Sequence, residues 1–213
     1  MSNQKKLVEA LRRKYPDEVT ADVEGSSDKY GNDWETWLNT DDQYRPELFV
    51  KLLGKWQAAR PRALRRLKQR AHHAPPYMEE LLDRAKPFLQ AIQHLTMIRV
   101  KNLSYAERKS ITGLWEIFSA MTQIESASCV GISKAVMLLS NGRIGPAFDS
   151  MVRKKLGISH LLNANEWISA LQGVSCDIEA FEIRHGVRLN KIMPARFQHL
   201  EYGRLYDMVF GPR

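Results

Sequence analysis

LWEIFSAMTQIESASCVGISKAVMLLSNGRIGPAFDSMVRKKLG, from Leu114 to Gly157, contains the turns and helix boundaries that organise this chain. Apolar residues at helical spacing flank a polar segment at 125–131, and a loop rich in glycine follows at 141–147. The pattern predicts a helix, a tight turn, a second helix over about 133–139 and then a loop. Asp149, ahead of a short helix that ends before Gly157, has the position of an N-cap residue.

Helical patterns also dominate outside this stretch, and alternating strand patterns are scarce. Ser104 with Glu107 forms a capping-box pattern ahead of an apolar helix that we expect to run to about Ile124. Residues 17–33 are polar and rich in glycine and serine, which predicts a loop. The sequence is therefore predicted to be all-α. Further helices are expected over about 7–15, 34–38, 46–56, 61–74, 77–95, 149–156, 163–171, 177–184 and 194–208.

The composition is that of an ordinary globular chain. Its 213 residues are 44% hydrophobic and 26% charged, enough apolar side chain to offset chain entropy and build a core. We expect one domain over 1–213, or two lobes that share a core. The longest uncharged run, 87–98, is shorter than the ~20 apolar residues of a membrane span, and the N-terminus has no apolar signal segment. The two cysteines make no disulfide framework, so we expect a cytoplasmic protein.

Positive charge is in excess and is concentrated in one segment. Lys and Arg number 32 against 24 Asp and Glu, a net charge of +8, which favours a polyanionic partner. Residues 60–70 are rich in arginine, with leucine and alanine at helical spacing, which predicts a helix with one buried stripe and a basic outer face. Each contact with phosphate would add salt-dependent affinity, although a merely solvated basic face is the alternative. The DNA-binding candidates here are Arg62, Arg65, Arg66 and Arg70.

The predicted turn before the second helix has features of a phosphate-binding site. Gly131 permits close approach to the backbone, and Val130 is placed to fill the turn between the helices. The amides at 132–134 open the predicted helix without intrahelical partners, and such amides hold anions. An ordinary turn glycine is the alternative. The DNA-binding candidates of this region are Val130, Gly131, Ser133, Lys134, Arg143 and Arg153.

Val130-Gly-Ile-Ser-Lys-Ala135, followed after the glycine-rich loop by Phe148-Asp-Ser-Met-Val-Arg153, resembles the helix-hairpin-helix DNA glycosylases. Their pattern is Gly-Val-Gly-x-Lys-x-Ala, a loop with glycine and proline, and an aspartate that opens a helix. The resemblance covers 114–157. It implies a two-lobed helical bundle with a helix-hairpin-helix motif at about 112–157, double-stranded DNA as the partner, and neither metal nor cofactor.

This sequence departs from the family pattern at three points. Cys129 replaces the first hairpin glycine, and no group of four cysteines follows, which excludes the iron–sulfur members. Ser133 occupies the position at which bifunctional members carry a Schiff-base lysine. Lys134 is one residue further, about 100° around a helix, so we expect it to point away from a site that faces Ser133. The resemblance therefore implies a monofunctional, hydrolytic glycosylase.

Asp149 is the candidate catalytic residue. Cleavage of an N-glycosidic bond builds positive charge on the deoxyribose, which a fixed carboxylate stabilises while it orients water. The start of a helix favours the ionised carboxyl, although a helix cap alone is the simpler interpretation. The extruded base needs an aromatic pocket, for which Trp115 and Phe118 are candidates. Burial in the core is the alternative for both, and Trp34, Trp37 and Tyr44 are further candidates.

The leading hypothesis is thus a monofunctional DNA glycosylase, monomeric and associated with the nucleoid. Its substrate base is open and includes a hypermodified phage base, which would make the enzyme antiviral. The alternative is a helix-hairpin-helix DNA-binding protein without chemistry, in which Asp149 only caps a helix. A helical adaptor for RNA or for a protein partner is the third possibility. The sequence contains no nucleotide-hydrolase phosphate loop.

Overall fold

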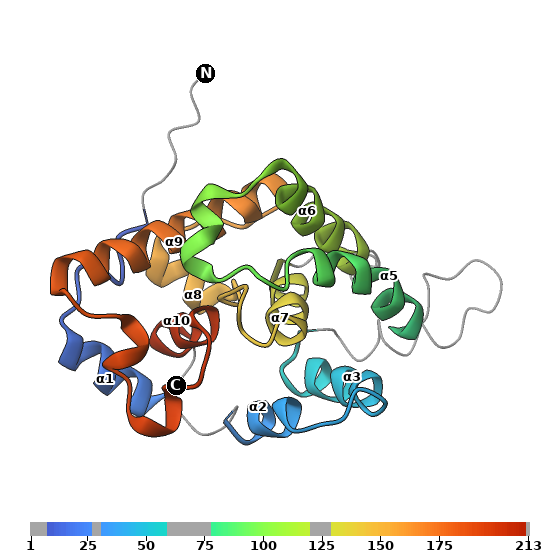
Figure 1. Cartoon of the computed structure of the whole chain (residues 1–213), viewed down its shortest axis with the longest axis horizontal. Coiled ribbons are helices and arrows are strands. Elements are labelled where there is room, and N and C mark those ends of the chain that lie inside the picture. The colour runs from blue at the N-terminus through green and yellow to red at the C-terminus, as the bar shows by residue number, and fades with distance from the viewer. Residues whose placement is uncertain (1–7, 27–30, 59–77, 120–128, 212–213) are drawn as a thin grey trace.

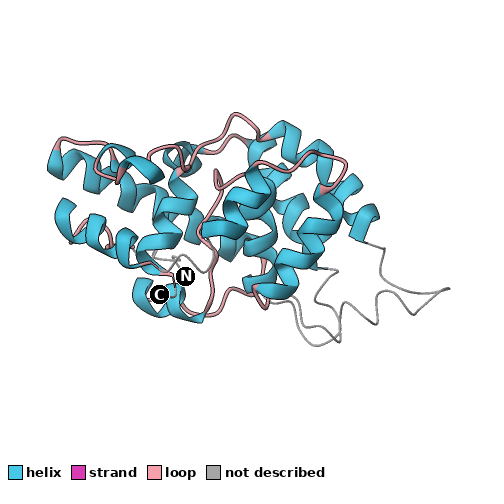
Figure 2. Ribbon diagram, turned by 90° about the horizontal axis from the view of Figure 1, so that it is seen from below, coloured by secondary structure: helices cyan, strands magenta, loops and turns pink. Residues whose placement is uncertain are grey.

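The computed structural model describes residues 8–26, 31–58, 78–119 and 129–211, and these ranges contain helices and loops but no strand (Figure 1, Figure 2). The all-α prediction is confirmed for them. No helix in these ranges is long and apolar enough to cross a bilayer. The predicted basic helix, with Arg62, Arg65, Arg66 and Arg70, lies outside the described residues. The helices are α1 Pro16–Gly25, α2 Gly31–Leu38, α3 Arg45–Lys55, α5 Met78–Ala91, η1 Met97–Asn102, α6 Tyr105–Ser119, α7 Cys129–Leu139, α8 Ser150–Leu156, α9 Ala164–His185, η2 Leu189–Lys191, η3 Ala195–Phe197 and α10 Tyr202–Phe210.

The helices surround a central pair formed by α7 and α8. In Figure 1, α9 runs along the upper side of the molecule, with α6 and η1 packed against it. α7 contacts α6 on one side and α3 on the other, while α8 contacts α10. Buried apolar side chains from both sides form one cluster, which includes Trp37, Phe118, Phe148 and Trp167. α7 and the loop that follows it are therefore largely buried in the core, while α8 contributes Val152 and Leu156 to it.

α1 begins at Pro16, where the sequence analysis predicted that a helix ends. A proline in the first turn loses no hydrogen bond, because the first amides of a helix have no intrahelical acceptor. The Glu18 carboxylate accepts a hydrogen bond from the Tyr15 amide at 2.7 Å, and Val19 and Val23 bury one face. Residues 8–15 form no helix, and helices cover 17–25 and 31–33, so both the helix predicted over 7–15 and the loop predicted over 17–33 were wrong for the described residues.

α9 is one helix of 22 residues, where two were predicted. The predicted helices, 163–171 and 177–184, left out 172–176. In the structure Ser175 Oγ donates to the Ile98 carbonyl at 3.0 Å, and the Gln172 side chain donates to the Lys101 carbonyl at 3.3 Å. These side chains satisfy groups of η1, so they are compatible with a continuous buried helix.

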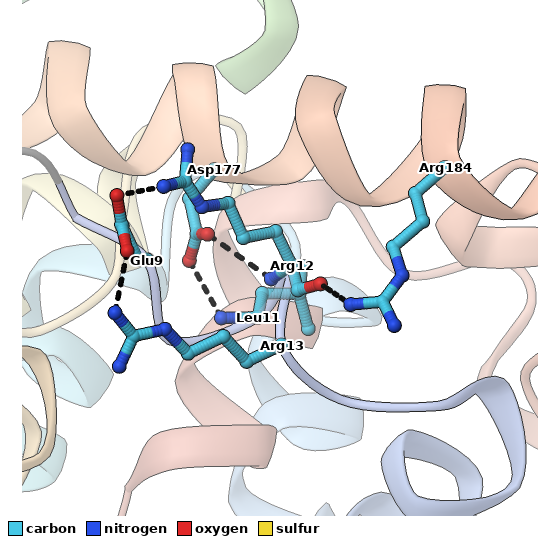
Figure 3. Close-up of polar contacts among 6 residues, drawn as sticks. All are labelled: Glu9, Leu11, Arg12, Arg13, Asp177 and Arg184. Atoms are coloured by element: carbon cyan, nitrogen blue, oxygen red, sulfur yellow. Dashed lines mark hydrogen bonds and ion pairs between the residues drawn. The ribbon is translucent and has the colours of Figure 1, made fainter.

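The N-terminal segment is held on α9 by a buried carboxylate (Figure 3). Asp177 accepts hydrogen bonds from the amides of Leu11 at 2.7 Å and Arg12 at 3.1 Å, and from the Tyr206 hydroxyl of α10 at 2.7 Å. Arg184 donates to the Arg12 carbonyl at 2.8 Å. Burial raises the pKa of Asp177, and the three donors act in the opposite direction. One side chain thus joins the N-terminal segment, α9 and α10.

The two capping patterns predicted from the sequence are confirmed. Asp149 caps α8, and Gly157 ends it in the left-handed conformation. Before α6, the Glu107 carboxylate accepts from the Ser104 amide at 2.7 Å, and Ser104 Oγ accepts from the Glu107 amide at 3.3 Å. His94 Nε2 also lies 2.7 Å from Glu107 Oε1. The Ser104 hydrogen bonds, followed by His94, lower the pKa of Glu107 to about 2.

We predict that Glu107→Gln makes stability less dependent on acid pH. Because the pKa of Glu107 is depressed in the folded state, its contribution is present above about pH 4.5 and is lost as the pH falls through about 2. The variant should lose about 1 kcal/mol at pH 7, and the difference should shrink on acidification. Urea unfolding at several pH values measures it. Glu116→Gln, an exposed residue of the same helix, is the control, and an equal loss at every pH would contradict the prediction.

Candidate functional site around Asp149

Asp149 is fixed through one of its two carboxylate oxygens. Oδ1 accepts hydrogen bonds from the amides of Met151 and Val152, both at 2.9 Å. Among the described residues no donor reaches Oδ2. The half-buried carboxylate therefore lies at the positive end of a helix with one oxygen held and one oxygen not used by the cap.

α7 begins at Cys129, four residues before the predicted Ser133. Gly131 is consequently buried inside the helix rather than in a turn, and the amides of Ser133 and Lys134 have carbonyls four residues earlier as acceptors. Ser133 is 1% exposed, and its hydroxyl donates to the Cys129 carbonyl at 2.6 Å and accepts from the Phe148 amide at 2.9 Å. Ser133 therefore links α7 to the residue before Asp149 and presents no group to the surface.

Lys134 is half-buried, and its side chain is directed to the end of α3. The Lys134 ammonium donates to the Trp56 carbonyl at 2.8 Å. Burial lowers the pKa of Lys134, while the negative charges of Asp149 and Asp207 raise it. The neighbouring Ser133 is directed instead to the Phe148 amide. That Lys134 points away from a catalytic site facing Ser133 stays a prediction.

The loop that leads to Asp149 lies directly against α10. The Arg204 amide donates to the Gly142 carbonyl at 3.1 Å. Gly142 has a positive φ of 80°, and a Cβ there would lie 2.8 Å from Arg204 Cβ. A Cβ on Gly203 would lie 2.5 Å from the Gly142 oxygen and 2.7 Å from the Gly145 nitrogen. Glycine is required on both sides because the two backbones are in contact.

Two charged residues of α10 complete the surroundings of this loop. Asp207 Oδ1 accepts from the Ala147 amide at 3.1 Å, and Oδ2 accepts from Arg204 Nη1 at 2.7 Å. Burial raises the pKa of Asp207, the Arg204 guanidinium lowers it, and the charge of Asp149 raises it further. The guanidinium carbon of Arg204 lies 5.2 Å from the Trp34 ring centroid, a cation–π contact, and Trp34 stacks on Trp56 at 6.4 Å.

The remaining predicted residues are dispersed. Arg153 Nε donates to the Phe148 carbonyl at 3.1 Å, and Val130 is half-buried. Arg143 is half-buried, and its Nε is buried without a hydrogen-bond partner. Trp115 is 6% and Phe118 0% exposed, so both occupy the core. Of the other aromatic candidates, Trp34 and Trp37 are buried and Tyr44 is exposed. The ranges that the structure describes hold no group of three or more metal-ligating side chains.

Sequence reasoning missed Arg204 and Asp207, although a local signal for them exists. They lie three positions apart in an otherwise apolar helix, YGRLYDMVF. Opposite charges at this spacing on a buried helix indicate an internal ion pair, because an unpaired buried charge is costly. Nothing in the local sequence connects that pair to Ala147, sixty residues earlier.

We predict that Gly142→Ala destabilises the protein more than Gly157→Ala. Both glycines have a positive φ, which costs another residue roughly 1–2 kcal/mol, but a Cβ at Gly157 would meet nothing within 4 Å. The clash with Arg204 should cost at least about 1 kcal/mol more at Gly142. Chemical denaturation of the two variants measures the difference. Equal losses would show that the loop and α10 are not in close contact.

Searches for relatives return nothing for this chain: no family model, no curated protein and no solved structure matches it. The likeness of 114–157 to helix-hairpin-helix glycosylases is one of sequence pattern. The geometry around Asp149 is therefore the basis for the functional proposal.

Proposed function

We propose that this chain is a monofunctional DNA glycosylase that hydrolyses the N-glycosidic bond of a modified or damaged base and leaves an abasic site. The observation that carries the proposal is the geometry of Asp149, whose Oδ1 is held by two amides while Oδ2 has no donor among the described residues. A carboxylate fixed in this way is oriented before substrate arrives. Such preorganisation is what stabilises developing positive charge in a transition state.

The electrostatic surroundings fit this role. Hydrolysis of the glycosidic bond places positive charge on the sugar, and Asp149 supplies the matching negative charge and a base for the attacking water. The carboxylate lies at the positive end of the α8 dipole. Lys134 keeps a cation in the field of the same carboxylate. In the proposed mechanism the target nucleotide leaves the duplex, and its sugar approaches Oδ2.

The DNA partner is proposed from charge and from the sequence pattern. The net charge of +8 favours a polyanion, and the basic segment 60–70, outside the described residues, is the proposed contact with flanking duplex. The proposal includes the two-lobed helix-hairpin-helix arrangement, but the amides of Ser133 and Lys134 have intrahelical acceptors and are not proposed as the phosphate contact. The alternative function is a DNA-binding protein in which Asp149 only caps α8, a role that the two amide hydrogen bonds favour.

Asp149→Asn separates the two functions. Asparagine keeps a cap acceptor but removes the charge, so we predict that base release slows by at least ~10²-fold while the fold and DNA affinity are retained. Each protein is incubated in single turnover with duplexes that carry damaged, methylated or hypermodified bases, including phage genomic DNA. Alkali then cleaves the strands at the abasic sites, and the strand breaks are measured.

Asn163→Ala is the matched control, because it removes the N-cap of α9 at a cost of about 1 kcal/mol. This variant should release base as fast as the wild type. Strand breaks that persist in Asp149→Asn would contradict the role of Asp149. Intact DNA binding without breaks on any substrate would favour the binding protein.

Borohydride trapping tests the monofunctional mechanism. Lys134 donates a hydrogen bond to the Trp56 carbonyl, which holds its ammonium on the α3 side of α7. We therefore predict no covalent adduct when wild-type protein is mixed with substrate DNA and borohydride. An adduct that is absent in Lys134→Gln would identify Lys134 as a nucleophile and contradict the monofunctional assignment. A known lyase on its own substrate is the positive control.

A further inference from the structure

We propose that Asp207 is a positioning residue of the base-excision site, which fixes the loop that leads to Asp149. This inference rests on the proposed function and adds to it a residue of α10 that makes no contact with the reacting atoms. The hydrogen bonds of Asp207 to the loop and to Arg204 carry the inference. The effect of its charge on Lys134 supports it.

The hydrogen bonds of Asp207 determine where the loop lies. Oδ1 accepts from the amide of Ala147, two residues before Asp149, at 3.1 Å. Oδ2 accepts from Arg204, whose own amide donates to the Gly142 carbonyl at 3.1 Å. The ion pair therefore contacts the loop at both ends. Since the backbones of α10 and the loop touch at Gly203, a shift of either one displaces Asp149.

The negative charge of Asp207 acts on Lys134 and on Asp149, the two side chains discussed for the proposed chemistry. The groups that influence the Lys134 ammonium are Asp149 at the start of α8, Asp207 of α10 and, from α3, the Trp56 carbonyl. Asp207 is itself paired with Arg204, which is 7% exposed and lies over Trp34. Asp149 and Asp207 both raise the pKa of Lys134, while burial lowers it. Removal of Asp207 leaves Asp149 alone to raise the pKa of Lys134.

Asp207→Asn is the test variant, because it removes the charge and keeps the size. Placing an amide beside Arg204 or Ala147 also disturbs one of the two hydrogen bonds. We expect single-turnover base release to fall by about 10²-fold, as for a reacting group displaced by about 1 Å, with the DNA dissociation constant unchanged. A second readout does not depend on activity: NMR titration of ¹³C-methylated lysines should show Lys134 titrating at lower pH in the variant.

Asp177→Asn is the matched control. Asp177 is a second buried carboxylate that contacts α10, through the Tyr206 hydroxyl, and it makes no contact with the Asp149 loop. The Asp177→Asn variant should unfold at a lower midpoint than the wild type. Its rate of base release and the titration of Lys134 should be unchanged. Asp207→Glu keeps the charge but lengthens the side chain, so it should slow base release and leave the Lys134 titration in place. This variant tests the position alone if Asp207→Asn does not fold.

The outcomes separate this inference from the proposed function. A wild type that releases no base from any substrate overturns the glycosylase, and the role of Asp207 in excision with it. An active wild type whose Asp207→Asn variant releases base at the same rate overturns the inference alone. Loss of activity in Asp177→Asn equal to that in Asp207→Asn would show a general effect of stability and would also overturn it.

Discussion

The contact between the backbone of α10 and the backbone of the 141–147 loop is the constraint on which the site depends. At Gly142 and Gly203 a single added carbon would collide with a neighbouring atom. Only this close approach allows Asp207 to reach the Ala147 amide and Arg204 to reach the Gly142 carbonyl. The direction in which the chain enters α8, and with it the place of Asp149, follows from packing against a helix near the other end of the sequence.

The charges near Asp149 compensate one another in a setting where water screens poorly. Lys134 and Arg204 bring two positive charges, and Asp149 and Asp207 bring two negative ones. Each buried charge would be costly alone, since removal from water disfavours the ionised form. Pairing with Arg204 offsets the cost of burying Asp207, and the loss of either residue leaves the other without its partner charge. Under the proposed function, the positive charge that develops on the sugar meets Oδ2 of Asp149, which accepts no hydrogen bond from the described residues.

Features with a local physical cause were predictable from the sequence, and features set by distant packing were not. The caps of α8 and α6 depend on residues within four positions, so Asp149, Gly157 and the Ser104–Glu107 pair were identified correctly. The sequence does not show which side of α7 faces the core, because that depends on where the helix begins and what covers it. The Lys134 bond to the Trp56 carbonyl and the Asp207 bond to Ala147, across sixty residues, therefore had no local sign.

The buried carboxylate of Asp177 has a consequence for the order in which the chain folds. Its hydrogen bond to the Leu11 amide spans 166 residues, and loops of that length close late because their closure entropy is large. During synthesis the residues around Leu11 leave the ribosome long before α9 exists, and the acceptor for the Leu11 and Arg12 amides is present only when Asp177 emerges. The N-terminal segment thus joins a helix assembled after it, and native topology is complete only when the last third of the chain has been translated.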